Sequence, residues 1–346
     1  MRERPRQPTG ADVAARAGVS RTTVSFVING RADVQIPAET RRRVIAAARE
    51  LDYHPHGPAR QLAAGASLTI GLVMRQSAEQ VAADMNLPNY LWGLAAAARA
   101  GDFRVLVEPL APGDGTYAGL LRSRRADGLV VSGPREDDDE LAALVRDGFP
   151  IVIQGSRADL QAPSVDVDNA LGARSAVEHL LELGHRRIGC ITNAPLQYTA
   201  ALERLAGYRA ALAGAGLEYD RGVVVDGAFD AASGYGAMVE LLSRTQPSAV
   251  FVASDVVAIG ALRGLRDAGL RVPGDVSIVA FDDIPIAAHV DPPLTTIHLP
   301  ADALGETAGR VLVDRIAGRS VPARTLLPID LIVRDSSAVA SKPSGR

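Results

Sequence analysis

Four polar residues near the N-terminus have the types and spacing needed to read the edges of DNA bases. Arg21, Thr22, Thr23 and Ser25 form the outward face at the start of a predicted helix. An arginine can pair with guanine through two hydrogen bonds, and a threonine can donate, accept or contact the methyl group of thymine. This group of side chains therefore predicts base recognition in a DNA groove.

Two short helices joined by a tight turn would hold these side chains in place. The first is predicted from about Ala11 to Ala17 after a Thr9 cap. Gly18 supplies the turn, because a positive φ costs a glycine little. Ser20 caps the second helix, which runs to about Ile28. This arrangement is typical of a helix-turn-helix. The alternative is a three-helix bundle that binds no nucleic acid.

Charge is distributed unevenly along the chain. Residues 1–65 hold 11 Arg and 6 acidic residues, a net charge of +5, whereas the remainder holds 26 basic and 34 acidic residues, a net charge of −8. A basic N-terminal part is a sign of nucleic-acid binding. On charge alone, a solvated charged segment explains it equally well. The same two alternatives apply to Arg41–Arg43 on a third helix, predicted from Pro37 to Leu51.

Length and composition exclude several classes of protein. The 346 residues are enough for two or three domains. No run of 18 apolar residues occurs, so no membrane-spanning helix is expected. The Arg-rich N-terminus does not resemble a secretory signal, which makes the cytoplasm the expected compartment. Cys190 is the single cysteine, which excludes an intrachain disulfide, and its apolar surroundings favour a core position over a nucleophile.

From Leu68 onward, short apolar runs alternate with longer amphipathic segments. This alternation predicts parallel sheets with helices on both faces, and eight units fit two doubly wound subdomains with a cleft between them. Such sheets bind ligands at the carboxyl ends of their strands. The predicted strands are Leu68–Met74, Arg104–Glu108, Gly128–Ser132, Ile151–Gln154, Arg187–Thr192, Gly222–Asp226, Ala249–Ala253 and Val276–Phe281. The predicted helices are Pro88–Ala100, Thr116–Arg124, Asp137–Asp147, Ala170–Leu183, Ala200–Ala213, Ala232–Leu242 and Asp255–Ala268.

A resemblance to the DNA-binding headpiece of LacI/GalR-family transcriptional regulators begins in the string TGADVAARAGVSRTTVSFVING. Later pieces, among them VDVDNALGA, ERLAGYRAAL and PSAVFVASDVVAIGAL, resemble the periplasmic-binding-protein-like effector domain of the same family. The resemblance covers nearly the whole chain. It implies an all-α helix-turn-helix headpiece followed by an α/β core of two doubly wound parallel-sheet subdomains.

The resemblance also implies the domain boundaries. We expect the headpiece at 1–56, a hinge helix at 57–66, the core at 67–335 and a polar tail at 336–346. Within the core, subdomain 1 is expected at about 67–165 and 295–322, and subdomain 2 at about 166–294 and 323–335. The tail lacks a leucine heptad, so a homodimer is expected rather than a tetramer held by a coiled coil.

Operator contacts in the family come from the headpiece and the hinge. The resemblance assigns them here to Thr9, Ser20, Arg21, Thr22, Thr23, Ser25, Phe26, Asn29, Arg60 and Leu62. Leu62 holds the position of a residue that wedges into the minor groove and kinks the duplex. Its alternative is an ordinary linker residue at the domain junction. Phe26 departs from the family pattern, because many members carry Arg there, so one hydrogen-bonding contact is lost.

Effector binding is expected in the cleft of the core. Arg204, in an R-x-x-G setting, can clamp sugar hydroxyls, phosphate or carboxylate, and Asp282 is the candidate acceptor for vicinal hydroxyls. The other candidates follow strands or precede helices: Ser254, Asp255, Phe229, Ser132, Tyr198 and Arg75. Ser254 replaces an Asn that is common in the family. Phe229 is either a stacking aromatic or part of the core.

The implied function is a sequence-specific DNA-binding transcriptional regulator, most simply a repressor, controlled by a small-molecule effector such as a sugar or sugar derivative. A homodimer would place two recognition helices in successive major grooves of a pseudo-palindromic operator. The alternative is a solute-binding protein without a DNA-binding role. An enzyme is not expected, since no G-x-G-x-x-G, Walker loop or nucleophile elbow occurs. No cofactor, metal site or membrane partner is expected.

Overall fold

The computed structural model describes residues 8–28, 34–53, 66–111 and 116–340. The chain divides into two compact units, Met1–Ser67 and Leu68–Arg346, which we treat as separate bodies. The predicted hinge with Arg60 and Leu62, and the predicted contact Asn29, lie outside the described residues. No helix among the described residues is long and apolar enough to cross a membrane.

The first unit is a helix-turn-helix with a third helix packed against it. Its helices are α1 (Gly10–Ala17), α2 (Arg21–Ile28) and α3 (Ala38–Glu50). The predicted cap of α1 is confirmed: Asp12 N donates to Thr9 Oγ1, and Thr9 N donates to the Asp12 carboxylate at 2.7 Å. Gly18 ends α1 with a φ of 66°, a left-handed conformation that a side chain would strain. Valines from all three helices fill the core.

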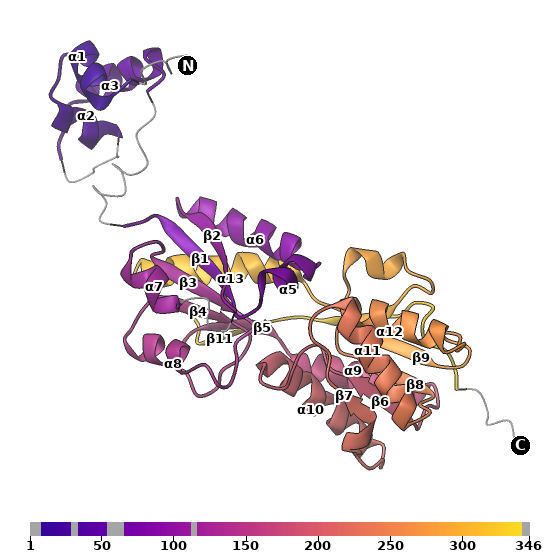
Figure 1. Cartoon of the computed structure of the whole chain (residues 1–346). Helices are drawn as coiled ribbons and strands as arrows, with labels where there is room; N and C mark the ends of the chain where they lie inside the picture. The colour runs from indigo at the N-terminus through magenta and orange to yellow at the C-terminus, as the bar shows by residue number, and fades with distance from the viewer. Residues whose placement is uncertain (1–7, 29–33, 54–65, 112–115, 341–346) are drawn as a thin grey trace, which may run out of the picture. The chain divides into compact units, whose positions relative to one another are not determined.

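The second unit begins with a six-stranded, fully parallel sheet in the order β11-β5-β4-β3-β1-β2 (Figure 1). Its strands are β1 (Thr69–Met74), β2 (Arg104–Pro109), β3 (Gly128–Ser132), β4 (Ile151–Gln154), β5 (Ser164–Val167) and β11 (Arg324–Leu327). Its helices are α5 (Ala78–Ala83), α6 (Leu87–Ala100), α7 (Tyr117–Arg122), α8 (Asp139–Arg146) and α13 (Ala301–Ile316). Leu72 and Val73 of β1 point into different apolar clusters, so both faces of the sheet are covered.

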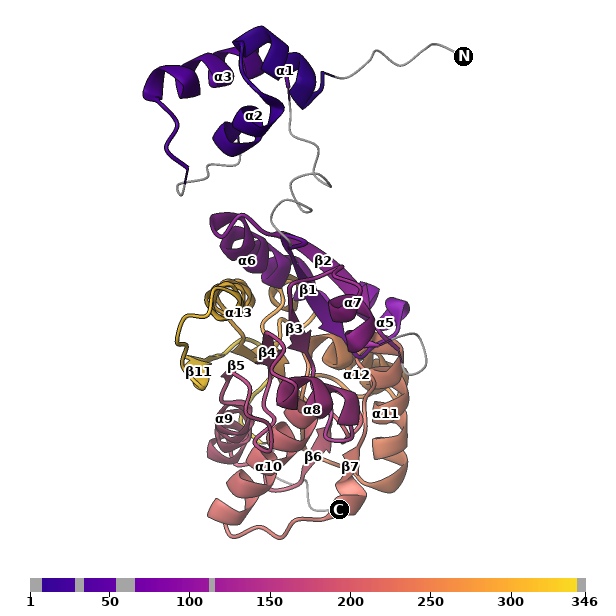
Figure 2. The same cartoon turned by 90° about the vertical axis from the view of Figure 1, so that its left-hand side faces the viewer.

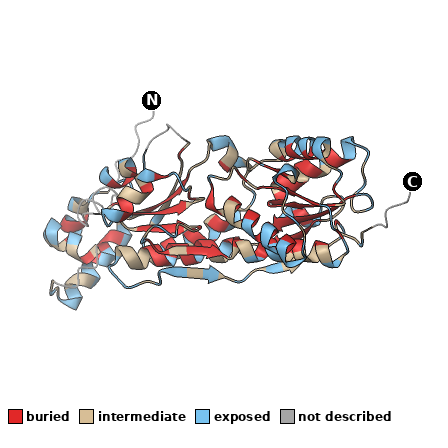
Figure 3. Ribbon diagram, turned by 90° about the horizontal axis from the view of Figure 1, so that it is seen from below, coloured by how far each residue is buried: buried red, intermediate tan, exposed pale blue. Residues whose placement is uncertain are grey.

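A second six-stranded sheet has the order β12-β10-β9-β8-β6-β7, and only its edge strand β12 runs antiparallel. Its strands are β6 (Ile188–Ile191), β7 (Val224–Val225), β8 (Ala249–Val252), β9 (Ser277–Asp282), β10 (Thr295–His298) and β12 (Asp330–Ile332). Its helices are α9 (Asn169–Glu182), α10 (Thr199–Gly214), α11 (Ala231–Arg244) and α12 (Asp255–Asp267), with short 3₁₀ turns at Arg221–Val223 and Pro285–Ala288. The prediction of two doubly wound subdomains is confirmed. Figure 3 shows buried strands between helices with exposed outer sides.

The last third of the chain corrects two of the expected subdomain boundaries. Strand β10, which we assigned to subdomain 1, pairs with β9 in the second sheet. Strand β11, which we assigned to subdomain 2, pairs with β5 in the first sheet. The chain therefore passes between the subdomains three times, after β5, after β10 and after β11. The physical reason is that α13 packs on β3, β4 and β5, so the strand after it is placed beside β5.

The polar tail expected from 336 begins later than the sequence indicates. Ser336 is fully buried, and its Oγ accepts from Thr295 N at 2.8 Å and donates to Ile278 O at 2.7 Å. His179 and His185 hold the same segment: a ring nitrogen of His179 lies 3.0 Å from Ser337 Oγ, and one of His185 lies 3.0 Å from Ala338 O. Small polar side chains here complete the second sheet instead of facing water.

Three helix pairs approach closely because glycine lies where they cross. A Cβ added at Gly234 of α11 would lie 1.9 Å from Val257 O of α12, and one added at Gly260 would lie 1.8 Å from Ala231 O. Gly93 and Gly305 play the same part between α6 and α13. Gly207 lets α10 approach α9. The helix pairs α11–α12, α6–α13 and α9–α10 therefore pack with their backbones in direct contact.

Gly234 and Gly236 lie on the same helix and give a matched test. We expect Gly234→Ala to destabilise the core by about 1–3 kcal/mol, since the methyl group meets backbone that cannot move easily. Gly236→Ala meets nothing within 4 Å and should be neutral or stabilise by about 0.4–1 kcal/mol through the unfolded chain. Urea unfolding of both variants measures the difference. Equal effects would contradict the crossing argument.

Candidate functional site

A cleft between the two subdomains, of about 170 Å³, lies at the carboxyl ends of the parallel strands. It combines five of the eight residues predicted for effector binding with polar residues from other loops. The predicted residues that line it are Ser132, Arg204, Phe229, Ser254 and Asp282. The polar residues that we did not predict are Gln76, Gln80, Asp84, Asn86, Tyr90, Gln154, Asp166, Asn169 and Asn193.

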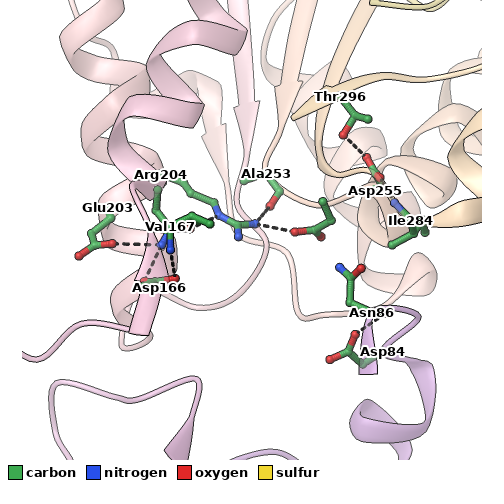
Figure 4. A network of polar contacts seen from close by, with 12 residues as sticks. Asp84, Asn86, Asp166, Val167, Glu203, Arg204, Ala253, Asp255, Ile284 and Thr296 are labelled. Carbon is green, nitrogen blue, oxygen red and sulfur yellow. Dashed lines mark hydrogen bonds and ion pairs between the residues drawn. The ribbon is translucent and has the colours of Figure 1, made fainter. Parts of the chain in front are cut away.

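Arg204 is the buried centre of this cleft (Figure 4). Helix α10 carries it, and its Nε donates to Asn169 Oδ1 at 2.9 Å. Its Nη1 donates to the carbonyl of Ala253 at 2.6 Å and to Asp282 Oδ1 at 3.3 Å. The guanidinium carbon lies 3.7 Å from the ring centre of Phe281, a cation–π contact. These contacts fix the guanidinium before any ligand arrives.

Asp282 ends β9 in a backbone conformation that L-residues rarely adopt, with a φ of 116°, and Asp283 follows with a φ of 54°. Such strain is typical of functional sites. Burial raises the pKa of Asp282 to about 6, while the positive charge of Arg204 acts against that rise. Asp282 is therefore a carboxyl held beside a cation at the wall of the cleft.

A second carboxyl, Asp166, lies on the other side of Arg204. Its oxygens accept from Val167 N at 2.8 Å and Asn169 Nδ2 at 2.9 Å, and burial raises its pKa to about 7 (Figure 4). Asn169 Nδ2 also donates to Glu203 Oε2 at 3.3 Å. The string VDVDNALGA contains both Asp166 and Asn169, so its resemblance to the family was the signal that could have located them.

The loop between α5 and α6 contributes Asp84 and Asn86 to the opposite wall. Asp84 Oδ1 accepts from Asn86 N at 2.9 Å and from Leu87 N at 3.3 Å, so this carboxylate also holds the start of α6. Burial raises its pKa. No periodic pattern marks such loop residues, which is why the sequence did not reveal them. Among the described residues, no group of three or more His, Cys, Asp or Glu is arranged to hold a metal ion.

The headpiece presents the other candidate site on α2. Arg21, Thr22 and Ser25 are exposed there, and Phe26 is half-buried. Ser20 caps the helix as predicted, because its Oγ accepts from Thr23 N at 3.1 Å. Since Thr23 Oγ1 also lies 2.9 Å from Ser20 Oγ, its hydroxyl is engaged within the turn.

Comparison with known proteins decides the family. Residues 11–56 match the model described as bacterial regulatory proteins, lacI family, and residues 177–337 match the periplasmic binding protein-like domain. The HTH-type transcriptional regulator CelR of Thermobifida fusca is 39% identical over 96% of this chain and 99% of its own length. The chain belongs to the LacI family. It is thus a DNA-binding transcriptional regulator, not an enzyme or a solute-binding protein without a DNA-binding role.

Solved LacI-family structures resemble this chain over nearly its full length. A structure of a CelR–cellobiose complex is 38% identical, covers 95% of this chain and 100% of its own, and has a TM-score of 0.74. A lac repressor dimer bound to operator and the anti-inducer ONPF is 31% identical, covers 96% and 100%, and has a TM-score of 0.83. The PurR repressor of Escherichia coli O1:K1 is 37% identical over 89% of this chain and 90% of its own.

The LacI-family resemblance assigns Asp255 to the effector site, but the structure places it behind the cleft. Asp255 is fully buried and does not line the cavity. Its carboxylate accepts from Ile284 N at 2.9 Å and from Thr296 Oγ1 at 2.6 Å, and burial raises its pKa well above the ordinary range (Figure 4). Asp255 therefore braces the strained loop that presents Asp282.

Tyr198 and Arg75 also lie off the cavity wall, where they join the subdomains instead. Tyr198 is buried, and its hydroxyl donates to the carbonyl of Arg75 at 2.5 Å. Its ring packs edge-on against Phe229 with the ring centres 4.8 Å apart. The Arg75 side chain turns to Asp138, with Nε 3.4 Å from Oδ2. Their positions in the sequence correctly indicated that both residues lie near the cleft. The sequence did not show that their side chains turn to other residues instead of lining the cavity.

The pKa of Asp166 makes stability depend on pH in a direction that can be worked out. The folded state keeps this proton up to about pH 7, while the unfolded chain loses it near pH 4. The folded state therefore binds more protons in this window, so Asp166 makes the free energy of unfolding fall as pH rises from about 4 to 7.

We expect Asp166→Asn to remove this slope, so that the variant gains stability relative to the wild type between about pH 4 and 7. Urea unfolding at a series of pH values measures it. Asp147→Asn, at an exposed position, is the control and should leave the slope unchanged. Parallel curves for Asp166→Asn and the wild type would contradict the assignment.

Proposed function

We propose that this LacI-family regulator is a repressor whose operator affinity changes when a neutral carbohydrate binds the cleft around Arg204. The observation that carries the proposal is the chemistry of the cleft wall. The cleft is lined by three acids, Asp84, Asp166 and Asp282, and by one guanidinium, that of Arg204. An anionic effector would meet more acidic than basic groups, whereas sugar hydroxyls can donate to the acid oxygens and accept from Arg204 and the nearby amides.

Two further features support a sugar. Phe229 lines the cleft with a ring held against Tyr198, which suits packing against the apolar face of a sugar ring. The CelR structure that this chain resembles contains cellobiose. Cellobiose and other neutral glycosides are therefore the first compounds to test.

The subdomain contacts support a switch between two arrangements. Hydrogen bonds join the two subdomains at the cleft edge: Tyr198 donates to Arg75 O, Thr199 N donates to Pro134 O at 3.2 Å, and Glu136 N donates to Gln197 O at 2.9 Å. A ligand shifts such an equilibrium only by binding one arrangement more tightly than the other. We propose that the sugar does this, that the protein acts as a dimer on a pseudo-palindromic operator, and that both occur in the cytoplasm.

The first test is a thermal-shift screen of the full chain against neutral sugars, sugar phosphates, nucleobases and organic acids. A ligand at a hundred times its dissociation constant stabilises the folded state by about 2.7 kcal/mol. Since each 1 kcal/mol moves the Tm of a domain of 150–250 residues by roughly 2–4 °C, this corresponds to a rise in Tm of roughly 5–11 °C. Neutral sugars are expected to act. Stabilisation only by anionic compounds, lost in Arg204→Ala, would overturn the proposed effector class.

Asp282→Asn keeps the shape of the side chain and removes its charge. If Asp282 accepts from sugar hydroxyls, the variant should bind the sugar about 10–100-fold more weakly, since hydrogen bonds to charged groups contribute about 1.5–3 kcal/mol. Titration calorimetry measures the dissociation constant. Asp267→Asn, at an exposed position on α12, is the matched control. Unchanged affinity in Asp282→Asn would remove Asp282 from the site.

Arg21→Ala tests the DNA-binding half of the proposal. Once an operator has been selected in vitro with the wild type, the variant should lose about 1–3 kcal/mol of specific binding if Arg21 pairs with a base. Fluorescence anisotropy with operator and scrambled duplexes measures both affinities. Equal discrimination by variant and wild type would reject the base contact.

Light scattering of the free protein should give the mass of two chains, and a mass of four would reject the dimer.

A further inference from the structure

A second cavity opens mainly on the first subdomain and shares no lining residue with the cleft, although Glu203 of the second subdomain also lines it. It has a volume of about 670 Å³ and lies between the segment 156–164, the end of α13 and the start of β11. Figure 2 shows β11 beside β5 and close to α13. Four arginines line it: Arg157, Arg315, Arg319 and Arg324. The cavity is therefore larger than the cleft and opposite to it in charge.

The four guanidiniums are only partly neutralised. Glu203 is the one acid in the lining, which leaves the lining a formal net charge of +3. Arg157 pairs with Asp159 at 2.8 Å, and Arg319 pairs with Asp314 at 2.5 Å. When these two outer carboxylates are counted as well, the formal net charge is still +1. Arg315 and Arg324 form no ion pair among the described residues.

Arg315 supplies a separate sign of a missing partner. Its Nε is buried in the cavity wall, and the described part of the chain offers it no hydrogen-bond acceptor. A buried donor on a charged group is costly to leave unpaired. Arg324, exposed on edge strand β11 opposite Ser164 of β5, brings a second unpaired guanidinium to the same cavity.

We propose that this cavity binds a small phosphate ester. A phosphate carries about two negative charges and three acceptor oxygens, which match guanidinium forks better than a single carboxylate does. The cavity is much larger than a phosphate ion, and the hydroxyls of Ser156, Ser164 and Ser320 line the rest of it. The ligand would therefore be a phosphorylated compound with a polar body, such as a sugar phosphate.

Glu203 connects this cavity to the cleft. Ser156 Oγ donates to Glu203 Oε1, while Oε2 accepts from Asn169 Nδ2, and Asn169 Oδ1 in turn accepts from Arg204 Nε at 2.9 Å. Ser156 and Glu203 belong to different subdomains, so an anion beside this pair acts on a contact that joins them. Binding at the two sites is therefore expected to be coupled, and coupling of this kind is reciprocal.

Titration calorimetry of the full chain with glucose 6-phosphate and inorganic phosphate tests the site, with glucose as the uncharged counterpart. Both phosphates should bind, the ester more tightly. Arg315→Gln and Arg324→Gln should each weaken binding at least about tenfold. Arg146→Gln, an exposed arginine on α8 outside the cavity, should not change it. Glu203→Gln should bind the phosphates more tightly, because it removes a negative charge from the wall.

Asp282→Asn separates this site from the cleft, since it should impair neutral-sugar binding and leave phosphate binding intact. The proposal is overturned if neither phosphate binds the wild type at millimolar concentration. It is also overturned if phosphate binding survives in both Arg315→Gln and Arg324→Gln, or is lost in Asp282→Asn. Circular dichroism checks that the variants fold, and Arg324 is exposed, so its replacement tests the site even if Arg315→Gln is unstable.

Discussion

The structure of the core depends on the burial of one guanidinium. A charge taken out of water must be compensated by hydrogen bonds and opposite charge, and removing a partner from a buried pair typically costs about 3–5 kcal/mol. Arg204 obtains this compensation from Asn169, the carbonyl of Ala253 and Asp282, which come from α9, the end of β8 and the end of β9. Three elements of the second subdomain are thus positioned by one side chain.

The same network reaches the first subdomain. Asp166 lies on β5 of the first sheet, yet its carboxylate accepts from Asn169 at the start of α9. Burial raises the pKa values of Asp282 and Asp166, while the positive charge of Arg204 acts against both rises. The polar wall of the cleft is therefore also a structural element. Under the proposed function, a ligand bound there would act on the arrangement of both sheets.

Sequence patterns predicted the long buried elements well and the short polar ones poorly. Strands such as β1 and β8 are continuous apolar runs, so their position and both-face burial could be inferred. Strand β5 reads SVDV and places an acid in its interior, and β12 has three residues. Neither carries a periodic signal. Strands β10 and β11, the two that we assigned to the wrong subdomains, are also short, with four residues each. In the cleft, Asp84 and Asn169 come from loop and helix-start positions, which composition does not mark.

The buried serine at the end of the second sheet has a consequence for the genetics of this protein. Ser336 joins the backbones of β9 and β10 through a single hydroxyl, ten residues before the last one. A premature stop codon just upstream would leave a buried amide and a buried carbonyl without partners. Loss of function from such a truncation would reflect a damaged sheet, open to proteases, although every residue that lines the two cavities would still be encoded.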